Sequence, residues 1–75
     1  METLTVKTSL SNCGEALRRA QFEYGVSNVQ LARDLGVPRQ EISRWRTQSD
    51  WRLSRVVQMS ERFGLSIEDF VSLGR

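Results

Sequence analysis

The chain has 75 residues and a net charge of +2, with 39% hydrophobic and 27% charged residues, so its length allows one small domain. The lack of histidine and the single cysteine exclude Cys/His zinc sites and both Ser-His-Asp and Cys-His catalysis. No apolar run approaches the roughly 18–20 residues that span a membrane, and no basic region followed by an apolar one marks a secretory signal. We therefore expect a non-enzymatic domain without metal, cofactor or membrane partner, and the lone Cys13 favours a reducing cytoplasm.

The N-terminal part of the chain divides into an arm and a first helix. Residues 1–10 have only weak strand propensity and are expected to form a flexible arm, which leaves residues 11–75 as the domain. Asn12 can cap the first helix, with Glu15 reaching back to the cap, and Gly25 supplies a stop. The apolar positions at helical spacing are Ala16, Leu17, Ala20 and Tyr24.

Two short helices follow, joined by the residues Leu-Gly-Val-Pro. Ser27 and Gln30 have the spacing of a capping box at the start of the second helix, and Gly36 ends that helix because glycine enters a left-handed turn without steric cost. Pro38 begins a third helix that runs to about residue 45. The residues expected to face the core are Leu31, Ala32, Leu35, Ile42 and Trp45.

The remaining third of the chain predicts two more helices. The fourth starts near Leu53 and stops at Gly64, and the fifth begins at Ser66. Their apolar faces are Leu53, Val56, Val57, Ser60 and Phe63 on the fourth helix and Ile67, Phe70, Val71 and Leu73 on the fifth. Because no strand-like alternation follows residue 10, the expected fold class is all-α with five helices.

The pair of helices at 27–46 has the spacing of a helix-turn-helix. Ala32 lies four residues before Gly36, and its small side chain suits a position where the third helix crosses close to the second. Ile42 lies six residues after that glycine. The stretch SNVQLARDLGVPRQEISRWR resembles the helix-turn-helix of phage-repressor and Cro-like DNA-binding domains. The stretch LSRVVQMSERFGLSIEDFVSLG resembles that family's fourth and fifth helices, so the resemblance covers about residues 13–74.

The resemblance implies a lambda-repressor-like domain that acts as a sequence-specific transcriptional regulator, most simply a small phage or prophage repressor occupying operator DNA. Residues 38–55 support this, because five arginines against two acids give them a net charge of +3. In this family the third helix enters the major groove, where arginine suits guanine and glutamine suits adenine. The positions that usually face the bases are here Arg39, Gln40, Ser43 and Arg44. The implied phosphate contacts are Asn28, Arg46, Thr47 and Gln48.

Some residues depart from the family pattern or leave alternatives open. The loop at 47–51 looks shortened, and Trp51 in it either caps the core or lies exposed. Arg46 replaces a frequent acidic residue, and Ser60 replaces a small apolar one and can bond back to a carbonyl one turn earlier. Phe22 falls off the apolar stripe of the first helix and is either partly exposed or a contact residue.

The resemblance also implies a homodimer on a palindromic double-stranded operator, with half-sites about 34 Å apart. The fifth helix has more apolar residues than one side can bury, so Phe70 or Leu73 is expected to reach the surface as a dimer contact. The alternatives are that all four apolar residues close the core, or that residues 1–8 supply the contact.

Another functional class stays open, because a fold does not fix a function. The same domain serves as a DNA-binding antitoxin or as a protein-interaction module. An antitoxin needs a segment that binds its toxin, and only residues 1–11 are spare for one.

Overall fold

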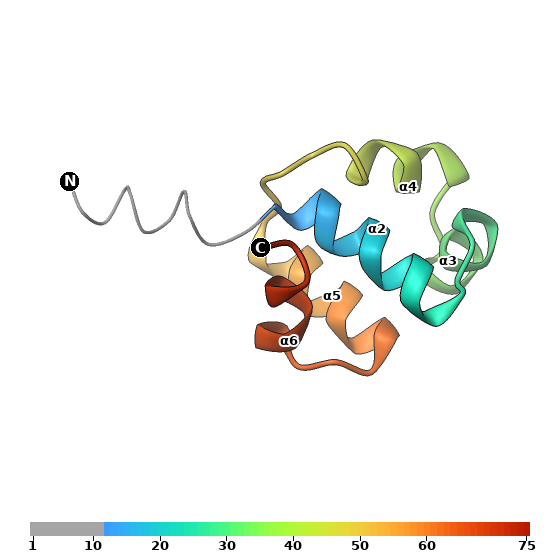
Figure 1. The fold of residues 1–75 in the computed structure, drawn as a ribbon. Helices are drawn as coiled ribbons and strands as arrows, with labels where there is room; N and C mark the ends of the chain where they lie inside the picture. Colours follow the sequence, from blue (N-terminus) through green and yellow to red (C-terminus); the bar gives the residue numbers. More distant parts are fainter. Residues whose placement is uncertain (1–11) are drawn as a thin grey trace.

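The computed structural model describes residues 12–75, so the N-terminal arm predicted at residues 1–10 lies outside the described residues. Within the described part the chain forms five α-helices and no strand, which confirms the all-α prediction (Figure 1). The helices are α2 (Cys13–Tyr24), α3 (Asn28–Leu35), α4 (Arg39–Trp45), α5 (Leu53–Phe63) and α6 (Ile67–Ser72).

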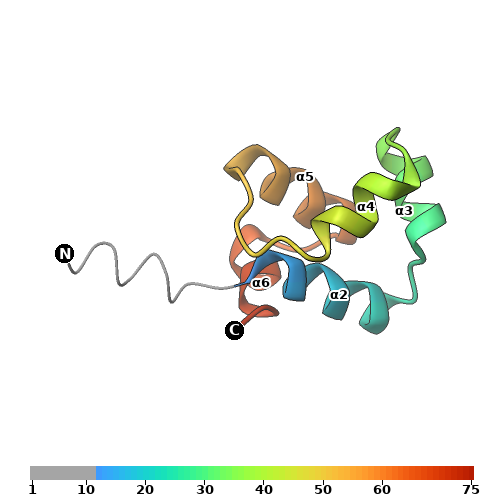
Figure 2. The same cartoon turned by 90° about the horizontal axis from the view of Figure 1, so that it is seen from above.

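The helix α2 is central to the arrangement. It packs against α5 and α6, which also pack against each other, while α3 packs against α4 (Figure 1). In Figure 1 α4 lies along the upper edge and α6 at the lower edge, and the view from above in Figure 2 shows α4 on the near side of the molecule. The pair α3 and α4 is therefore presented at one edge of a support made by the other three helices.

The start of α2 agrees with its predicted cap only in part. Asn12 accepts a hydrogen bond from the backbone N–H of Glu15 at 3.0 Å, as expected of an N-cap. The prediction that the Glu15 side chain reaches back to the cap is wrong, because its carboxylate pairs instead with the guanidinium groups of Arg18 and Arg19. These two arginines lie three and four residues further along the same helix face, where ion pairs form readily.

The helix-turn-helix has the predicted local signals. Ser27 and Gln30 form a reciprocal capping box at the start of α3. Gly36 ends α3 with φ +70°, a left-handed conformation that costs other residues energy. Pro38 precedes α4 with φ −65°, so the turn between the two helices is closed by residues whose backbone preferences match it.

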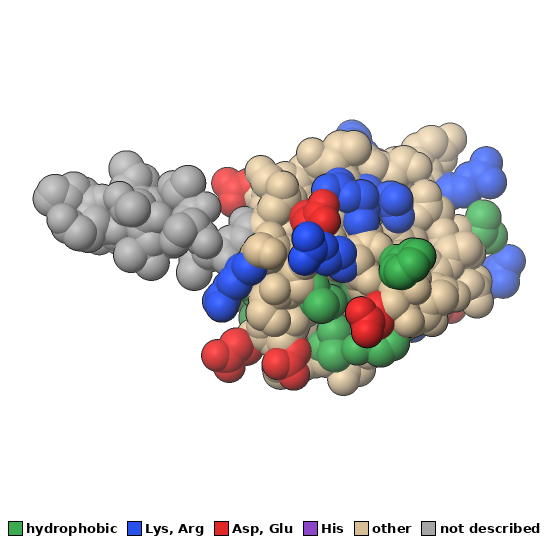
Figure 3. All heavy atoms as spheres, in the orientation of Figure 1, with side chains coloured by type: hydrophobic (Ala, Val, Ile, Leu, Met, Phe, Trp, Pro, Cys, Tyr) green, Lys and Arg blue, Asp and Glu red, His purple; other side chains and the backbone are tan. Residues whose placement is uncertain are grey.

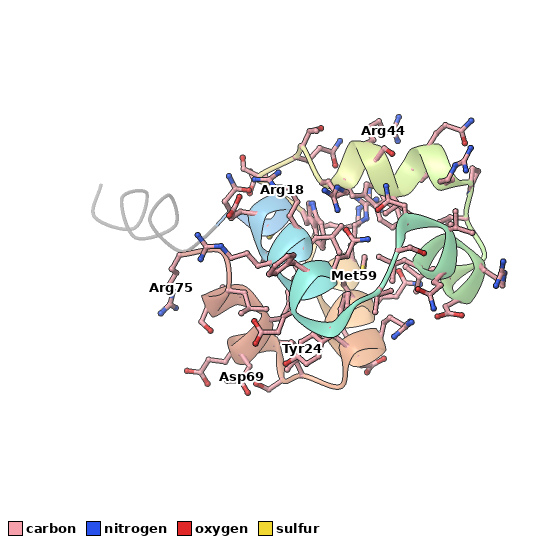
Figure 4. The ribbon with its side chains drawn as sticks, turned by 45° about the vertical axis from the view of Figure 1, so that its right-hand side comes forward. Arg18, Tyr24, Arg44, Met59, Asp69 and Arg75 are labelled. Carbon is pink, nitrogen blue, oxygen red and sulfur yellow. The ribbon has the colours of Figure 1, made fainter. Side chains whose placement is uncertain are left out.

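The core is apolar and is built by all five helices of the described part. Its fully or nearly fully buried hydrophobic residues are Ala16, Leu17, Ala20, Leu31, Ala32, Ile42, Trp45, Val56, Met59 and Phe70. The predicted face of α5 needs one correction, because Leu53 is 68% exposed whereas Met59 is buried and lies in the interior in Figure 4. At about 100° per residue the buried face is centred on Val56 and Met59, and Leu53 lies at its margin.

Aromatic packing joins α6 to the loop after α4. Phe70 is fully buried, and its ring centroid lies 5.9 Å from that of Trp51 and 6.5 Å from that of Phe63. Trp51 therefore caps the core, and its Nε1 donates to the Trp45 carbonyl at 3.3 Å. The expectation that Phe70 reaches the surface as a dimer contact is wrong, because these rings fill the space around it. Leu73 is half-buried against the core, and Ile67 is the more exposed apolar residue of α6.

Candidate nucleic-acid interface

The helix α4 has one buried face and one exposed polar face. Ile42 and Trp45 point inward and are 0% and 5% exposed. The structure brings all four predicted base-facing residues together on the exposed side of this short helix, and Figure 4 shows Arg44 at the upper edge of the molecule. They are Arg39, Gln40, Ser43 and Arg44. This face carries donors and acceptors that a base edge requires.

The two arginines of this face differ in their contacts. Arg44 forms an ion pair with Glu41 at 2.9 Å, and its side chain is 62% exposed. An exposed pair at this spacing is worth only about 0.3–0.5 kcal/mol, so it does not prevent Arg44 from contacting another group. The side chain of Arg39 forms no hydrogen bond or ion pair within the described part of the chain.

The residues after α4 form a tight turn. The backbone N–H groups of Arg46, Thr47 and Gln48 donate to carbonyls of the last turn of α4. The Thr47 hydroxyl donates to the Arg44 carbonyl at 2.8 Å, and Thr47 remains exposed, while Gln48 is half-buried. The predicted phosphate-contacting residues of this segment are therefore on an ordered turn.

The other predicted phosphate-contacting residue, Asn28, is joined to Arg46 through a residue that the sequence interpretation missed. Gln21 of α2 is 6% exposed, and its Nε2 donates to Asn28 Oδ1 at 2.8 Å and to the Val26 carbonyl at 3.1 Å. Its Oε1 accepts a hydrogen bond from the guanidinium group of Arg46. The start of α3 and the end of α4 are thus connected through one buried amide.

The first turn of α2 fixes the path of the loop. The Cys13 N–H donates to the Ser49 carbonyl at 3.0 Å, and the guanidinium group of Arg18 donates to the Arg46 carbonyl. Gly14 lies so close that a Cβ built on it would be 2.6 Å from the Arg46 carbonyl oxygen. A glycine inside a predicted helix is unfavourable by about 1 kcal/mol, and this local anomaly was the sequence signal for a close backbone approach.

The two remaining arginines of the positively charged stretch at residues 38–55 occupy different environments. Arg52 is exposed and precedes α5. The guanidinium carbon of Arg55 lies 4.3 Å from the ring centroid of Trp45, which is a cation–π contact. Trp45 Nε1 is buried without a hydrogen-bond partner in the described part of the chain. Arg55 therefore packs against Trp45 on the inward face of α4, besides adding positive charge to the stretch.

Charge is distributed unevenly over the face drawn in Figure 3. Basic side chains gather in the upper half of the view, near α4 and α2, with acidic side chains among them, and further acidic side chains lie at the lower edge, over α6. The acidic residues Glu68 and Asp69 lie in the first turn of α6, where negative charge interacts favourably with the helix dipole. Figure 4 places Asp69 on the side of the molecule opposite Arg44. The edge that presents α4 is thus the one suited to a polyanion.

No group of three or more metal-ligating side chains occurs among residues 12–75. None of the described helices is long and apolar enough to cross a membrane.

The fold and the exposed polar face of α4 are those of a helix-turn-helix DNA-binding domain. Residues 15–73 match the family of the bacteriophage CI repressor helix-turn-helix domain. The match extends from the first turn of α2 to the end of α6, so the chain belongs to this family and is a DNA-binding transcriptional regulator of phage-repressor type. Comparisons with curated proteins and with solved structures find no match.

Proposed function

We propose that this protein is a repressor that occupies operator DNA by placing α4 in the major groove. The observation that carries the proposal is the division of α4 between a buried face, Ile42 and Trp45, and an exposed face with two arginines, a glutamine and a serine. A helix of this kind at the edge of a small domain fits the width of the major groove. Occupation of a promoter then blocks transcription without a further domain.

The side chains of α4 have different roles in this proposal. Arg39 and Arg44 bind guanine O6 and N7, and Gln40 binds adenine N6 and N7. Ser43 is short and contacts either a base edge or a phosphate. Since Arg44 is paired with Glu41 in the free protein, binding exchanges one exposed ion pair for a bidentate contact.

The DNA backbone is bound on both sides of α4. Asn28 at the start of α3 contacts one phosphate, and Arg46, Thr47 and Gln48 after α4 contact others. The ordered turn of residues 46–48 supports this role, because groups already held by the fold lose little entropy on binding.

A homodimer on a palindromic operator is part of the proposal. Phe70 is excluded as a contact by its burial, but Leu73 lines a hollow together with Phe22, which is 91% exposed, and with charged residues of α2. These charged residues are Arg18, Arg19 and Glu23. Figures 1 and 2 show α2 away from the upper edge that presents α4, and Figure 3 shows apolar, basic and acidic side chains side by side over α2. In the proposed dimer, two copies pair through this face of α2 about a two-fold axis, and both α4 helices remain available to the same DNA duplex.

The same exposed Phe22 favours a second candidate function, a protein-interaction module such as the DNA-binding antitoxin of a toxin pair. The two candidates differ in what they require of DNA and of a partner. A repressor binds its operator with full strength alone, whereas an interaction module needs a second protein for its activity.

Titration of the full chain against labelled DNA of random sequence tests the proposal. We expect saturable binding whose affinity falls steeply with salt, with a slope of the logarithmic plot of about −0.9 for each phosphate contacted. The matched control is Arg75→Ala, which removes one positive charge at the far end of the chain and leaves the proposed interface intact. No binding at low salt, or an affinity independent of salt, would contradict DNA binding through the phosphates.

A further inference from the structure

Gln21 is a buried polar side chain whose hydrogen-bonding groups are all used. An amide offers two N–H donors and one carbonyl oxygen. Both donors are engaged, one by the Val26 carbonyl and one by Asn28 Oδ1, and the oxygen accepts from Arg46. A glutamine on a helix facing an apolar core costs energy unless it is bonded in this way. Its partners, however, belong to two separate segments of the proposed DNA interface.

The contact with Gln21 determines which way the amide of Asn28 points. Because Gln21 donates to Asn28 Oδ1, the oxygen of Asn28 is directed inward and its Nδ2 donors are left for another acceptor. A phosphate needs donors, so this is the orientation that binds DNA. The opposite orientation of the same amide would present an oxygen to the phosphate.

The contact with Arg46 restricts a long and flexible side chain. Arg46 has five N–H donors, and Gln21 Oε1 binds one nitrogen of the guanidinium group, which leaves donors on the others. Because this hydrogen bond already restrains the guanidinium group in the free protein, Arg46 loses less rotamer freedom on binding DNA than an unrestrained arginine does.

We propose that Gln21 is a positioning residue that presents Asn28 and Arg46 together to the DNA backbone. Gln21 itself does not contact DNA in this proposal, since it is 6% exposed. It links the first residue of α3 to the residue after α4, which are far apart in sequence and share no hydrogen bond with each other in the described structure. The inference rests on the proposed function, because it concerns the phosphate contacts of the same interface.

Two substitutions separate the parts of this network. Gln21→Met keeps the length of the side chain and removes every hydrogen bond. Gln21→Glu keeps an acceptor for Arg46 but has no donor for Asn28. The Asn28 amide therefore turns its donors inward, toward the new carboxylate. The negative charge of that carboxylate also offsets the positive charge of Arg46. We expect affinity for DNA to fall about fivefold to tenfold in Gln21→Met, as for one or two net hydrogen bonds, and further in Gln21→Glu.

The salt dependence of binding distinguishes a positioning role for Gln21 from a purely structural one, because a purely structural role leaves the salt slope unchanged. The full-length variants are measured well below their melting temperatures on one DNA fragment that the unaltered chain binds. We expect the logarithmic salt slope of Gln21→Glu to be smaller in magnitude by about 1, because one phosphate-facing charge is offset. Gln58→Met, at an exposed glutamine of α5, is the matched control and leaves affinity and slope unchanged.

A second measurement applies even where a Gln21 variant does not fold. Asn28→Ala and Arg46→Ala are made singly and together in the chain with Gln21 intact. If Gln21 couples the two side chains, the double variant loses less affinity than the product of the two single losses. Independent losses, or folded Gln21 variants with unchanged affinity and salt slope, would overturn the inference. Failure of the unaltered chain to bind any DNA would instead overturn the proposed function.

Discussion

Replacement of Gly14 by alanine tests how α2 fixes the loop that follows α4. A Cβ at this position would lie 2.6 Å from the Arg46 carbonyl oxygen and 2.7 Å from the Gln48 carbonyl oxygen. Ordinary contacts begin at 3.4 Å, so one backbone must move by about 0.8 Å relative to the other. Both obstructing atoms belong to the main chain, and no side-chain rotation relieves the clash.

The cost follows from two opposing effects. Overpacking of this kind costs about 1–3 kcal/mol, while alanine is a better helix former than glycine by about 1 kcal/mol. We therefore expect Gly14→Ala to lower the free energy of unfolding by up to about 2 kcal/mol, with a fall in Tm of about 4–8 °C for each kcal/mol. DNA affinity should fall as well, because the displaced carbonyls belong to Arg46 and Gln48 in the proposed phosphate-contacting turn.

Thermal and urea unfolding followed by circular dichroism measure the stability, and a titration with DNA measures the affinity of the same samples. Gln58→Ala is the control, since Gln58 is exposed on α5 and its replacement should change stability by less than about 0.5 kcal/mol. A Gly14→Ala variant at least as stable as the unaltered chain, with the same affinity, would refute the close packing of α2 against the loop.

Three further predictions concern single side chains. Arg44→Ala should reduce affinity for the preferred DNA by about 1–3 kcal/mol with an unchanged circular dichroism spectrum, and a matching loss of helicity would make Arg44 structural instead. Hydrogen bonds from Arg18 and Arg19 lower the pKa of Glu15 below its ordinary value of 4.5, so this carboxylate stabilises the fold above pH 4.5 and the contribution is lost as the pH falls through the lowered pKa. Glu15→Gln should remove that part of the pH dependence of Tm, and an unchanged profile would contradict it. Phe22→Ser should weaken dimer formation on DNA without lowering Tm, because the ring is 91% exposed; undiminished dimerisation in sedimentation would exclude this face as the contact.

The sequence was sufficient for most of the local structure of this fold, with the Glu15 cap and the position of Leu53 as the exceptions. The capping box at Ser27, the left-handed Gly36 and the inward spacing of Ile42 and Trp45 are signals contained within a few residues, and all three are present in the structure. Because the four polar residues of α4 alternate with this buried pair, their common exposed face was also predictable.

Features that depend on residues distant in sequence were missed. Gly14 and Gln21 contact the turn at residues 46–48, and nothing near them in the chain specifies that neighbour. The error at Phe70 has the same origin, because its burial depends on Trp51 and Phe63 from two other segments. Counting the apolar residues of α6 alone predicted that one would be exposed but not which one, and it is Ile67 rather than Phe70.

The most direct test of the central claim, that α4 binds base edges, is selection of bound DNA from a random library with the full chain and with Gln40→Ala. We expect an enriched palindromic motif with half-sites about one helical turn apart. We also expect Gln40→Ala to lose the preference for adenine at one position of each half-site while the rest of the motif persists. No enriched motif, or the same motif at unchanged strength in the variant, would contradict recognition through this face of α4.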